Sequence, residues 1–397
     1  MTSICRLCGS SQTEVHFQRG KTYFWHGPRT PYFDATLAKA NLSAQIYVCR
    51  DCGFIGLPVD GTLRDMLHDY YTSPLSMPGT THGTNNKFAK ARTDEFFTAL
   101  AELGQKEAPK KVLEVGCQQG FLLAEFLRRG AARAVGVEPG DIPPTEDHQG
   151  KPIDVKRGFL SEELVGETGF DFAYSLQVFE HIENPNQFLS VLHRLLKLGG
   201  KLLLAVPNEG LALNAGNPGV FVYQHLNLFT EKTLESALLR NGFKPVAKIF
   251  DQEKPLYLIA EKIEAATVPS SRQSLGDENR ELLQRYTRRV DAKLERISEI
   301  AKGKPDTSVA LWGCNAAMAN IYSWGEGFRE RKWRVIDSDP SKIGVRFGGI
   351  PTVVEPPDVI QEVTDVIVIP YRAEASIMRM IDAMPNVKAR FHRLYED

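Results

Sequence analysis

Apolar residues recur along this chain in patterns that predict short strands separated by helices. Runs of buried-strand type, rich in Val, Ile and Leu, occupy residues 112–115, 134–137, 170–175, 201–206 and 256–261. A second series occupies residues 309–312, 333–336 and 366–369. Amphipathic segments lie between these runs. The alternation predicts an α/β fold with a parallel, doubly wound sheet in the middle of the chain and a second, smaller α/β domain after it.

A charged segment with helical periodicity separates the two series. Its apolar positions recur at intervals of three and four residues, at Leu282, Tyr286, Val290, Leu294, Ile297 and Ala301. Asp277 and Glu278 supply an acidic start, and the Gly-Lys-Pro sequence at 303–305 supplies a stop. We expect one long helix here, with its charges turned to solvent.

Four cysteines near the amino terminus form two Cys-x-x-Cys pairs, Cys5 with Cys8 and Cys49 with Cys52, and each pair is followed by glycine. This arrangement is typical of two knuckle turns whose thiolates converge on one tetrahedral ion, so we predict a Zn²⁺ site. Four sulfur ligands leave no open position for a reactive water, which makes the site structural. The alternatives are four free thiols or two disulfides, but the pairing and the spacing favour a metal.

Composition narrows the class of ligand. The chain has 397 residues with a formal net charge of −1, and 42% of its residues are hydrophobic. A near-neutral charge argues against a nucleic-acid partner, which needs clustered Lys and Arg, and favours a small substrate. No apolar run approaches the ~20 residues of a membrane span, nothing at the amino terminus resembles a signal peptide, and paired thiols suit a reducing compartment. We therefore expect a cytoplasmic protein without a membrane partner.

The segment 112–121, Val-Leu-Glu-Val-Gly-Cys-Gln-Gln-Gly-Phe, is a buried strand that continues into a glycine-bearing turn and an amphipathic helix. About twenty residues later the next strand ends at Glu138, an acid placed to accept hydrogen bonds from the two hydroxyls of a ribose. The turn reads Glu-x-Gly-x-x-x-Gly and lacks the spacing of a pyrophosphate cradle. The pattern favours a ligand with a single adenosyl group.

These residues resemble the class I S-adenosylmethionine-dependent methyltransferases. The segment 170–182 is similar to the fourth strand of that family and the loop after it, and the segment 198–208 is similar to the turn and fifth strand that follow. Four matching elements occur in the family's order. The resemblance implies a central class I methyltransferase sheet with S-adenosylmethionine as methyl donor.

The resemblance also implies roles for single residues. Glu114 and Gly116 are expected near the methionine part of the donor, Glu138 on its ribose and Gln177 near the sulfonium. Many members carry an acid for the adenine amino group where this chain has Arg-Gly-Phe, so we expect Phe159 to stack on the adenine. The expected donor-binding residues are Glu114, Gly116, Cys117, Gly120, Glu138, Pro139, Phe159, Ser175, Leu176 and Gln177.

The sequence after the fifth predicted strand supplies a candidate base. Residues 223–230 read Tyr-Gln-His-Leu-Asn-Leu-Phe-Thr, in a loop expected above the carboxyl ends of the strands. Methyl transfer requires the protein mainly to align the nucleophile and to remove its proton, and a histidine with an unperturbed pKa near 6.5 suits the second task. We predict that His225 is this base; a role in capping and packing the following helix is the alternative.

Taken together, the cysteine pairs, the central pattern and the C-terminal region resemble the zinc-containing C-methyltransferases that act on nucleotide-linked keto-sugars in deoxysugar biosynthesis. In that family a Glu-His pair is implicated in forming an enediolate that attacks the methyl group. Here the pair is Gln224-His225, and because an amide cannot act as the base, His225 works alone or with Tyr70, Tyr71 or His181. The resemblance implies that the two tyrosines form a lid over the substrate and that His181 orients a ligand; packing and a structural histidine are the alternatives.

We divide the chain into a zinc-binding domain (1–65), a methyltransferase domain with a lid segment (66–268), a linker helix (269–303) and a C-terminal Rossmann-like α/β domain (304–397). The C-terminal domain begins with a strand, a turn of small residues and a helix. It lacks two of the three glycines of a dinucleotide site, so we expect it to contact substrate or to close over it.

Three functions are compatible with these features. The favoured one is S-adenosylmethionine-dependent C-methylation of a nucleotide-linked keto-sugar with His225 as base. The second keeps the donor but methylates an oxygen or nitrogen of a sugar or another small metabolite, with Gln224 holding the acceptor. The third is a zinc-ribbon interaction protein whose methyltransferase fold has lost activity, which the pattern of Glu114, Gly116 and Glu138 disfavours.

Overall fold

The chain forms two compact units, described here from a computed structural model. The structure describes residues 4–22, 42–72, 87–105, 107–250, 255–264, 273–340, 342–345, 352–384 and 387–395. Unit 1 comprises Met1–Thr13, Cys49–Asn208 and Leu226–Asp277, and unit 2 comprises Glu14–Val48, Glu209–His225 and Glu278–Asp397. Each unit is built from three separate segments of sequence. The four-domain division remains a prediction, and residues 73–86 of the expected lid segment lie outside the described residues.

A seven-stranded sheet with the order β6-β5-β4-β7-β8-β10-β9 forms the centre of unit 1. Its strands are β4 (Lys111–Val115), β5 (Arg133–Glu138), β6 (Asp154–Arg157), β7 (Phe170–Leu176), β8 (Leu196–Val206), β9 (Phe243–Ile249) and β10 (Leu256–Lys262). The five strands from β6 to β8 in this order are parallel, as the apolar runs predict. The strand order reverses direction beside β4, and ligands of open α/β sheets bind at the carboxyl ends of the strands at such a point.

The far end of this sheet departs from the all-parallel prediction, which is wrong for β10. This strand pairs antiparallel with both β8 and β9. Only residues 250–255 separate β9 from β10, and a connection this short can join antiparallel strands but cannot carry a parallel crossover. The sheet is therefore mixed: it is parallel around the glycine-bearing turn and antiparallel at the opposite edge.

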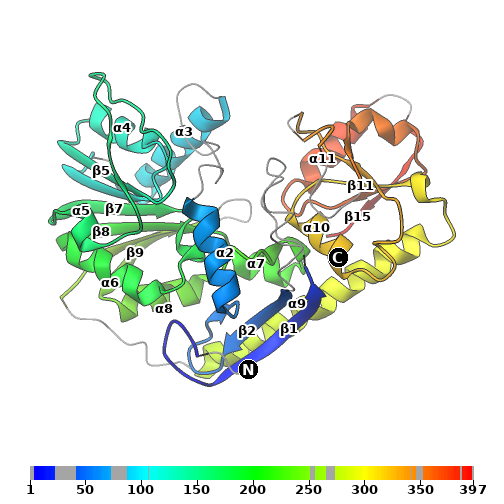
Figure 1. Cartoon of the computed structure of the whole chain (residues 1–397), viewed down its shortest axis with the longest axis horizontal. Coiled ribbons are helices and arrows are strands. Elements are labelled where there is room, and N and C mark those ends of the chain that lie inside the picture. Colours follow the sequence, from blue (N-terminus) through cyan, green and yellow to red (C-terminus); the bar gives the residue numbers. More distant parts are fainter. Residues whose placement is uncertain are drawn as a thin grey trace. The chain divides into compact units, whose positions relative to one another are not determined.

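Helices cover both faces of the sheet, with α3 and α4 on one face and α6 and α8 on the other (Figure 1). The helices of unit 1 are α2 (Gly61–Thr72), α3 (Lys87–Glu102), α4 (Phe121–Arg128), α5 (Glu162–Val165), α6 (Pro185–Leu195) and α8 (Glu231–Arg240), with the short turn η1 (Phe179–His181) after β7 and the short strand β3 (Ile55–Gly56). Local capping explains where they start. Asn184 caps α6 ahead of a proline, and Thr230 with Thr233 forms a capping box at α8.

Unit 2 contains a five-stranded parallel sheet with the order β13-β12-β11-β14-β15. Its strands are β11 (Val309–Trp312), β12 (Arg334–Ile336), β13 (Val354–Glu355), β14 (Asp365–Val368) and β15 (Arg390–Arg393), and its helices are α7 (Glu209–Asn214), α10 (Ala316–Trp324) and α11 (Glu374–Asp382), with 3₁₀ turns η2 (Pro218–Val220), η3 (Asp306–Ser308) and η4 (Pro357–Gln361). The predicted second α/β region thus forms a sheet of its own.

The long helix expected in the charged segment forms as α9 (Gln273–Ala301). It begins four residues before Asp277 and ends ahead of the Gly-Lys-Pro stop. In unit 2 its Tyr286 packs against Phe17 of β1 (Thr13–Lys21), which neighbours β2 (Ser43–Cys49), with the ring centroids 5.1 Å apart. In the part of the chain that the structure describes, no helix has the length and hydropathy that crossing a membrane would require.

Candidate active site

The turn after β4 brings bare backbone to the carboxyl edge of the sheet in unit 1. Gly116 has a φ of 80°, and a Cβ at this position would lie 2.3 Å from Cγ2 of Val178, in the loop after β7. Its N–H donates to the carbonyl of Val137 at 2.8 Å, which ties the turn to β5. A side chain is therefore excluded here for steric reasons, and bare backbone lies at the carboxyl ends of the strands, where ligands of open α/β sheets bind.

Glu138 ends β5 and is held in place by the backbone. One carboxylate oxygen accepts the N–H of Gln118 at 2.9 Å, and the other accepts the N–H of Gly140 at 2.9 Å. Pro139 lies between Glu138 and Gly140 in the chain. Only 8% of Glu138 is exposed. An ionised carboxylate has about four lone-pair positions, so two amide contacts leave acceptor capacity for the hydroxyls of a ribose.

The backbone at this edge is strained at two places. Among the described residues, the non-glycine positions with positive φ are Gln118 at 49° and Gln177 at 56°. Gln118 lies in the turn after β4, and Gln177 follows β7. Strain of this kind costs of order 1–3 kcal/mol per residue and persists where surrounding structure enforces it, often at ligand sites.

Glu114 is a buried acid within β4. Its carboxylate accepts a hydrogen bond from the hydroxyl of Tyr174 at 2.9 Å. Burial raises the pKa of Glu114 to about 8, against the opposing effect of the tyrosine hydrogen bond, and the charge of Glu138 raises it further. A cation bound beside Glu114, such as the ammonium or sulfonium of a methionine group, would favour the ionised carboxylate.

The other predicted donor-binding residues of this edge differ in exposure. Ser175 is fully buried at the end of β7, and its hydroxyl has no partner among the described residues. Leu176 is half-buried and Gln177 is exposed. Gly120 precedes α4, whose first turn is not capped by any side chain. Burial raises the pKa of the Cys117 thiol, so this residue remains a packed thiol rather than a nucleophile.

Phe159 lies on the surface, with 51% of its area exposed. Its ring is 5.6 Å from that of His68 on α2. An exposed ring can stack on a flat base, and the adenine contact of Phe159 stays a prediction.

Three predicted acceptor residues come together in unit 1. Tyr70 and Tyr71 lie in the last turn of α2 with their ring centroids 5.1 Å apart, and the ring of Tyr71 is 5.6 Å from that of His181. His181 also lies 3.8 Å from the carboxylate of Glu180, which is 1% exposed. Burial raises the pKa of Tyr71 well above its usual value, so its hydroxyl keeps the proton and acts as a hydrogen-bond donor.

Gln224 and His225 belong to unit 2, not to the unit that contains the glycine-bearing turn. Nδ1 of His225 lies 3.3 Å from Oε1 of Glu209, the first residue of α7. Gln224 is buried, and the His225 side chain keeps about a quarter of its surface exposed. A buried carboxylate from position 209 thus lies beside the imidazole of His225.

The segment 209–225 is anchored by the rest of unit 2. Asn320 of α10 donates hydrogen bonds from its side-chain amide to the carbonyls of Pro218 and Phe221, each at 2.7 Å. The hydroxyl of Tyr223 donates to the carbonyl of Leu42 at 3.0 Å. These contacts fix the loop that carries His225.

The four N-terminal cysteines form one cluster in unit 1, with all four sulfur atoms within 4.8 Å of one another. The Sγ–Sγ distances are 3.6 Å for Cys5–Cys52 and 3.5 Å for Cys8–Cys49. A disulfide would require ~2.05 Å, so the two-disulfide alternative is wrong. Sulfur atoms around a tetrahedral Zn²⁺ at ~2.3 Å lie about 3.8 Å apart, so the cluster has the dimensions of a zinc site.

Electrostatics of the thiols also suit a cation. Contacts within the cluster raise the pKa of Cys5 and Cys52 and lower the pKa of Cys8 and Cys49. A cation among the four sulfur atoms would favour their ionised form. The first knuckle is fixed to the sheet region of unit 1, since the side-chain amide of Asn186 donates to the carbonyls of Arg6 and Leu7.

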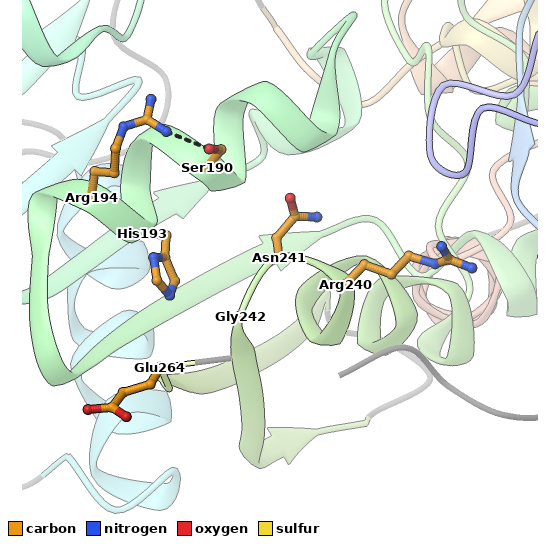
Figure 2. Close-up of a pocket in the computed structure, with 7 residues that line it drawn as sticks. All are labelled: Ser190, His193, Arg194, Arg240, Asn241, Gly242 and Glu264. Carbon is orange, nitrogen blue, oxygen red and sulfur yellow. Dashed lines mark hydrogen bonds between the residues drawn. The ribbon is translucent and has the colours of Figure 1, made fainter. Parts of the chain in front are cut away.

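A pocket lies at the other ends of the strands, away from the glycine-bearing turn (Figure 2). It is lined by Ser190, His193, Arg194, Arg240, Asn241, Gly242 and Glu264. His193 and Arg194 precede β8, and Gly242 precedes β9, so the pocket lies at the amino ends of these strands. Figure 2 shows that the two arginines point away from each other, and Arg194 is bound to Ser190. Ligands of open α/β sheets bind at the carboxyl ends, so this pocket is not the donor site.

The sequence-based predictions missed four residues of the candidate site: Gln118, Gly140, Tyr174 and Glu209. Gln118 and Gly140 act through backbone N–H groups, which leave no trace in residue type. Tyr174 lay in a predicted strand, where an aromatic residue is ordinary. Glu209 carried a usable signal, because it is an acid three residues after the fifth parallel strand, where functional residues of such sheets gather.

The middle of the chain matches known methyltransferases. Residues 88–248 match the family model described as "Methyltransferase domain". The chain is 33% identical over 110 residues to a ubiquinone biosynthesis O-methyltransferase of Pseudomonas aeruginosa (strain LESB58), covering 26% of this chain and 46% of that protein. It is 34% identical over 106 residues to a ubiquinone biosynthesis O-methyltransferase of Maricaulis maris, covering 25% of this chain and 41% of that protein. Each match thus spans less than half the length of the relative.

Solved structures of methyltransferases are also similar. One is an S-adenosylmethionine-dependent methyltransferase from Mesorhizobium loti, with a TM-score of 0.33 and 16% identity over 42% of this chain and 97% of that one. Another is 1,6-didemethyltoxoflavin-N1-methyltransferase from Burkholderia thailandensis with bound S-adenosylhomocysteine, with a TM-score of 0.34 and 20% identity over 53% of this chain and 96% of that one. By the family model, residues 88–248 of this chain are thus similar to a methyltransferase domain.

Proposed function

We propose that this protein transfers a methyl group from S-adenosylmethionine to the carbon next to the carbonyl of a nucleotide-linked keto-sugar, with His225 as the base. The observation that carries the proposal is Glu138. Its carboxylate is held by two amides at the end of β5, beside the open turn at Gly116, and keeps acceptor capacity for a ribose. The sugar acceptor is supported by the resemblance of the chain to the zinc-containing C-methyltransferases.

The proposal assigns donor binding to Glu138 and the turn at Gly116, and proton removal to His225. When bound, the donor supplies an electrophilic methyl group on a positively charged sulfur. A neutral His225 takes the proton of the acceptor carbon on a ring nitrogen, and the electron pair left behind forms an enediolate of the sugar. The protonated Tyr71 hydroxyl donates a hydrogen bond to a sugar oxygen, and His181 beside it orients the ring.

A second candidate is O- or N-methylation of a sugar or another small metabolite. It is favoured by the amide at Gln224, which can hold an acceptor but cannot remove a proton, and by the O-methyltransferase names of the curated relatives. Solvent deuterium separates the two. Incubation with an accepted nucleotide-linked keto-sugar in D₂O without methyl donor exchanges the acceptor C–H only if the carbon is deprotonated, so no exchange would favour the second candidate.

The direct test is a panel of nucleotide-linked sugars incubated with the protein and S-adenosylmethionine. The expected product is one methyl group heavier, and NMR locates the new bond on carbon. A methyl group on oxygen or nitrogen would replace the first proposal by the second. Absence of S-adenosylmethionine binding by calorimetry would instead support an inactive interaction protein.

We further propose that Cys5, Cys8, Cys49 and Cys52 bind one Zn²⁺ with a structural role. The dimensions of the cluster support this assignment, and four thiolates would leave no coordination position for catalysis. Metal analysis of the purified protein should give one zinc per chain. A metal-free, folded protein would contradict the proposal.

A further inference from the structure

The strongest unassigned feature of unit 2 is the pair formed by Glu209 and His225. Glu209 is 4% exposed, yet its Oε1 lies 3.3 Å from Nδ1 of His225. It is the first residue of α7 and lies three residues after the end of β8. A buried carboxylate without a positive or hydrogen-bonding partner is costly, so a polar group beside it must compensate.

The pair is built on a segment that cannot easily move. After α7, the carbonyl of Ala215 accepts a hydrogen bond from Nζ of Lys293 at 2.9 Å. Further along, Asn320 binds two loop carbonyls, and Tyr223 packs edge-on against Phe221 with the ring centroids 5.0 Å apart. The N–H of His225 donates to the carbonyl of Val222 at 3.1 Å. Both members of the pair are therefore fixed by packing, and the contact between them is set by the fold.

We propose that Glu209 is a positioning residue that accepts the Nδ1–H of His225, fixes this tautomer of the imidazole and leaves Nε2 as the atom that removes the proton from the acceptor. A neutral imidazole has one donor nitrogen and one acceptor nitrogen, so a carboxylate at Nδ1 decides which is which. The expected effect of Glu209 on turnover rests on the proposed function. The expected effect of Glu209 on the tautomer of His225 does not depend on that function.

The role proposed for Glu209 accounts for the amide at position 224. An amide beside the histidine in sequence cannot ionise, and its charge state cannot favour the imidazolium that forms when the base takes a proton. Glu209 supplies that negative charge from another turn of the fold, since a nearby carboxylate stabilises a protonated imidazole. An acid next to the base in sequence is then not required.

Titratable and charged groups of α9 also lie near this pair. Burial raises the pKa of Tyr286 well above its usual value, with the charge of Glu209 adding to the shift, so this phenol stays neutral. The side chains of Arg289 and Lys293 donate to carbonyls at the end of α7, Asn214 and Ala215. A variant at position 209 must therefore be isosteric, so that these contacts survive.

The first arm of the test reads the tautomer without any acceptor. Full-length protein is labelled with ¹⁵N-histidine, and the ring signals of His225 are assigned from their loss in His225→Gln. We expect wild type to show a protonated Nδ1 and an unprotonated Nε2 at pH 8. Glu209→Gln should shift the population toward the Nε2–H tautomer, and Glu209→Asp should shift it less. Unchanged His225 signals in Glu209→Gln would overturn the proposal.

The matched control is Glu374→Gln. Glu374 is also a buried carboxylate of unit 2, 5% exposed, but it is bound to Arg393 and the backbone N–H of Tyr395. This variant should leave the signals of His225 unchanged. Thermal melting of both variants checks that they fold, and a His225 shift in the control alone would also contradict the proposal.

The second arm measures methyl transfer to the acceptor found in the nucleotide-sugar panel. Glu209→Gln should lower kcat about 10- to 100-fold, a part of the 10²–10⁴-fold that a positioned base supplies, with KM little changed. The acidic limb of the kcat/KM profile should move to lower pH, because the carboxylate that favours the imidazolium is gone. A purely structural role would lower activity without moving this limb.

The two proposals can fail separately. If His225→Ala keeps near-normal turnover while the NMR shift occurs, His225 is not the base, but Glu209 still controls its tautomer. If His225→Ala abolishes turnover while Glu209→Gln changes neither the tautomer nor the pH profile, the proposed base stands and the role of Glu209 is wrong.

Discussion

The half-sheet β4–α4–β5 of unit 1 and the half-sheet β11–α10–β12 of unit 2 follow one backbone plan. In unit 1 the N–H of Gly116 donates to Val137 at 2.8 Å, and the residue after Val137 is the acid Glu138. In unit 2 the N–H of Gly313 donates to Ile336 at 2.7 Å, and the residue after Ile336 is the acid Asp337. Both sheets also share the order of their first five strands, β6-β5-β4-β7-β8 and β13-β12-β11-β14-β15.

The similarity extends to the steric reason for the glycine and to the amides on the acid. A Cβ at Gly313, whose φ is 112°, would lie 2.3 Å from Pro370, the second residue after β14, just as one at Gly116 would meet Val178, the second residue after β7. Asp337 accepts the N–H groups of Cys314 at 2.8 Å and Asp339 at 2.9 Å. Each acid is thus held by one amide of the glycine turn and one amide of its own turn.

The two acids differ in what else they bind. Nζ of Lys342 lies 2.8 Å from Asp337 and 3.1 Å from the carbonyl of Cys314, so the position of a ribose is taken by a lysine. Among the described residues, no ion pair involves Glu138. The same backbone arrangement therefore leaves the carboxylate of Glu138 available to a ligand in unit 1, whereas in unit 2 the carboxylate of Asp337 is paired with Lys342. A nucleoside site cannot be inferred from the strand-turn-helix pattern alone.

The first way to sharpen the comparison separates donor binding from turnover. His225→Ala should lower turnover roughly 10²–10⁴-fold because a general base is lost, while S-adenosylmethionine affinity stays at the wild-type value. Rapid-quench kinetics with the accepted sugar and calorimetry with the donor measure the two quantities. Turnover within a few-fold of wild type would place the base elsewhere.

The second way compares the two acids directly. Glu138→Ala should weaken donor binding by about 1–3 kcal/mol, because charge-assisted hydrogen bonds to the ribose are lost. Asp337→Ala, the matched change in unit 2, should leave donor affinity unchanged. Calorimetric titration of S-adenosylmethionine into both variants measures the difference, and equal losses would mean that the comparison is misleading.

The third prediction concerns the strand residue two positions before each glycine. This residue is an acid in unit 1, Glu114 of β4, and apolar in unit 2, Leu311 of β11. The folded-state pKa of Glu114, about 8, is raised from an ordinary value of 4.5. Between these values the folded protein holds a proton that the unfolded chain has lost, so the stabilising contribution of Glu114 is present below about pH 4.5 and disappears as the pH rises through 8.

Glu114→Gln should therefore reduce the fall in unfolding free energy between pH 5 and pH 9, as denaturant melts across this range would show. At the upper end of the range the variant should be more stable than wild type, since it buries no charge. An identical pH dependence in the two proteins would contradict the raised pKa.

The smallest expected effect concerns the lysine that distinguishes unit 2. Lys342→Met should destabilise the protein by about 1–2 kcal/mol, because Asp337 loses a charged partner in a partly buried position. Donor affinity should not change. A second equivalent of S-adenosylmethionine bound by Lys342→Met would show that the lysine alone had closed a working site.

Much of this comparison could be predicted from the sequence. The apolar runs predicted β4, β5, β7 and β8, four of the five parallel strands of unit 1. Glu138, at the end of β5, was identified by its distance in sequence from the glycine turn. These features are local: burial selects the runs, and backbone geometry selects the glycine. β6 and β9 were missed because their residues are largely half-buried or exposed.

The remaining features depend on contacts distant in sequence. The carboxylate of Glu209 meets His225 sixteen positions later only because the chain between them is folded against α10. Lys342 reaches Asp337 only because the chain turns between these two residues, and the residue types alone do not predict the geometry of that turn. β10 is antiparallel because the connection from β9 is short. The apolar runs alone predicted parallel strands because they carry no information about the length of this connection.

The most direct test of the central claim is a crystal structure of the protein soaked with S-adenosylhomocysteine. The account predicts one ligand per chain, with both ribose hydroxyls on the carboxylate of Glu138 and the adenosyl group against the turn at Gly116. A ligand beside Asp337, or a ligand bound away from the ends of β4 and β5, would contradict it.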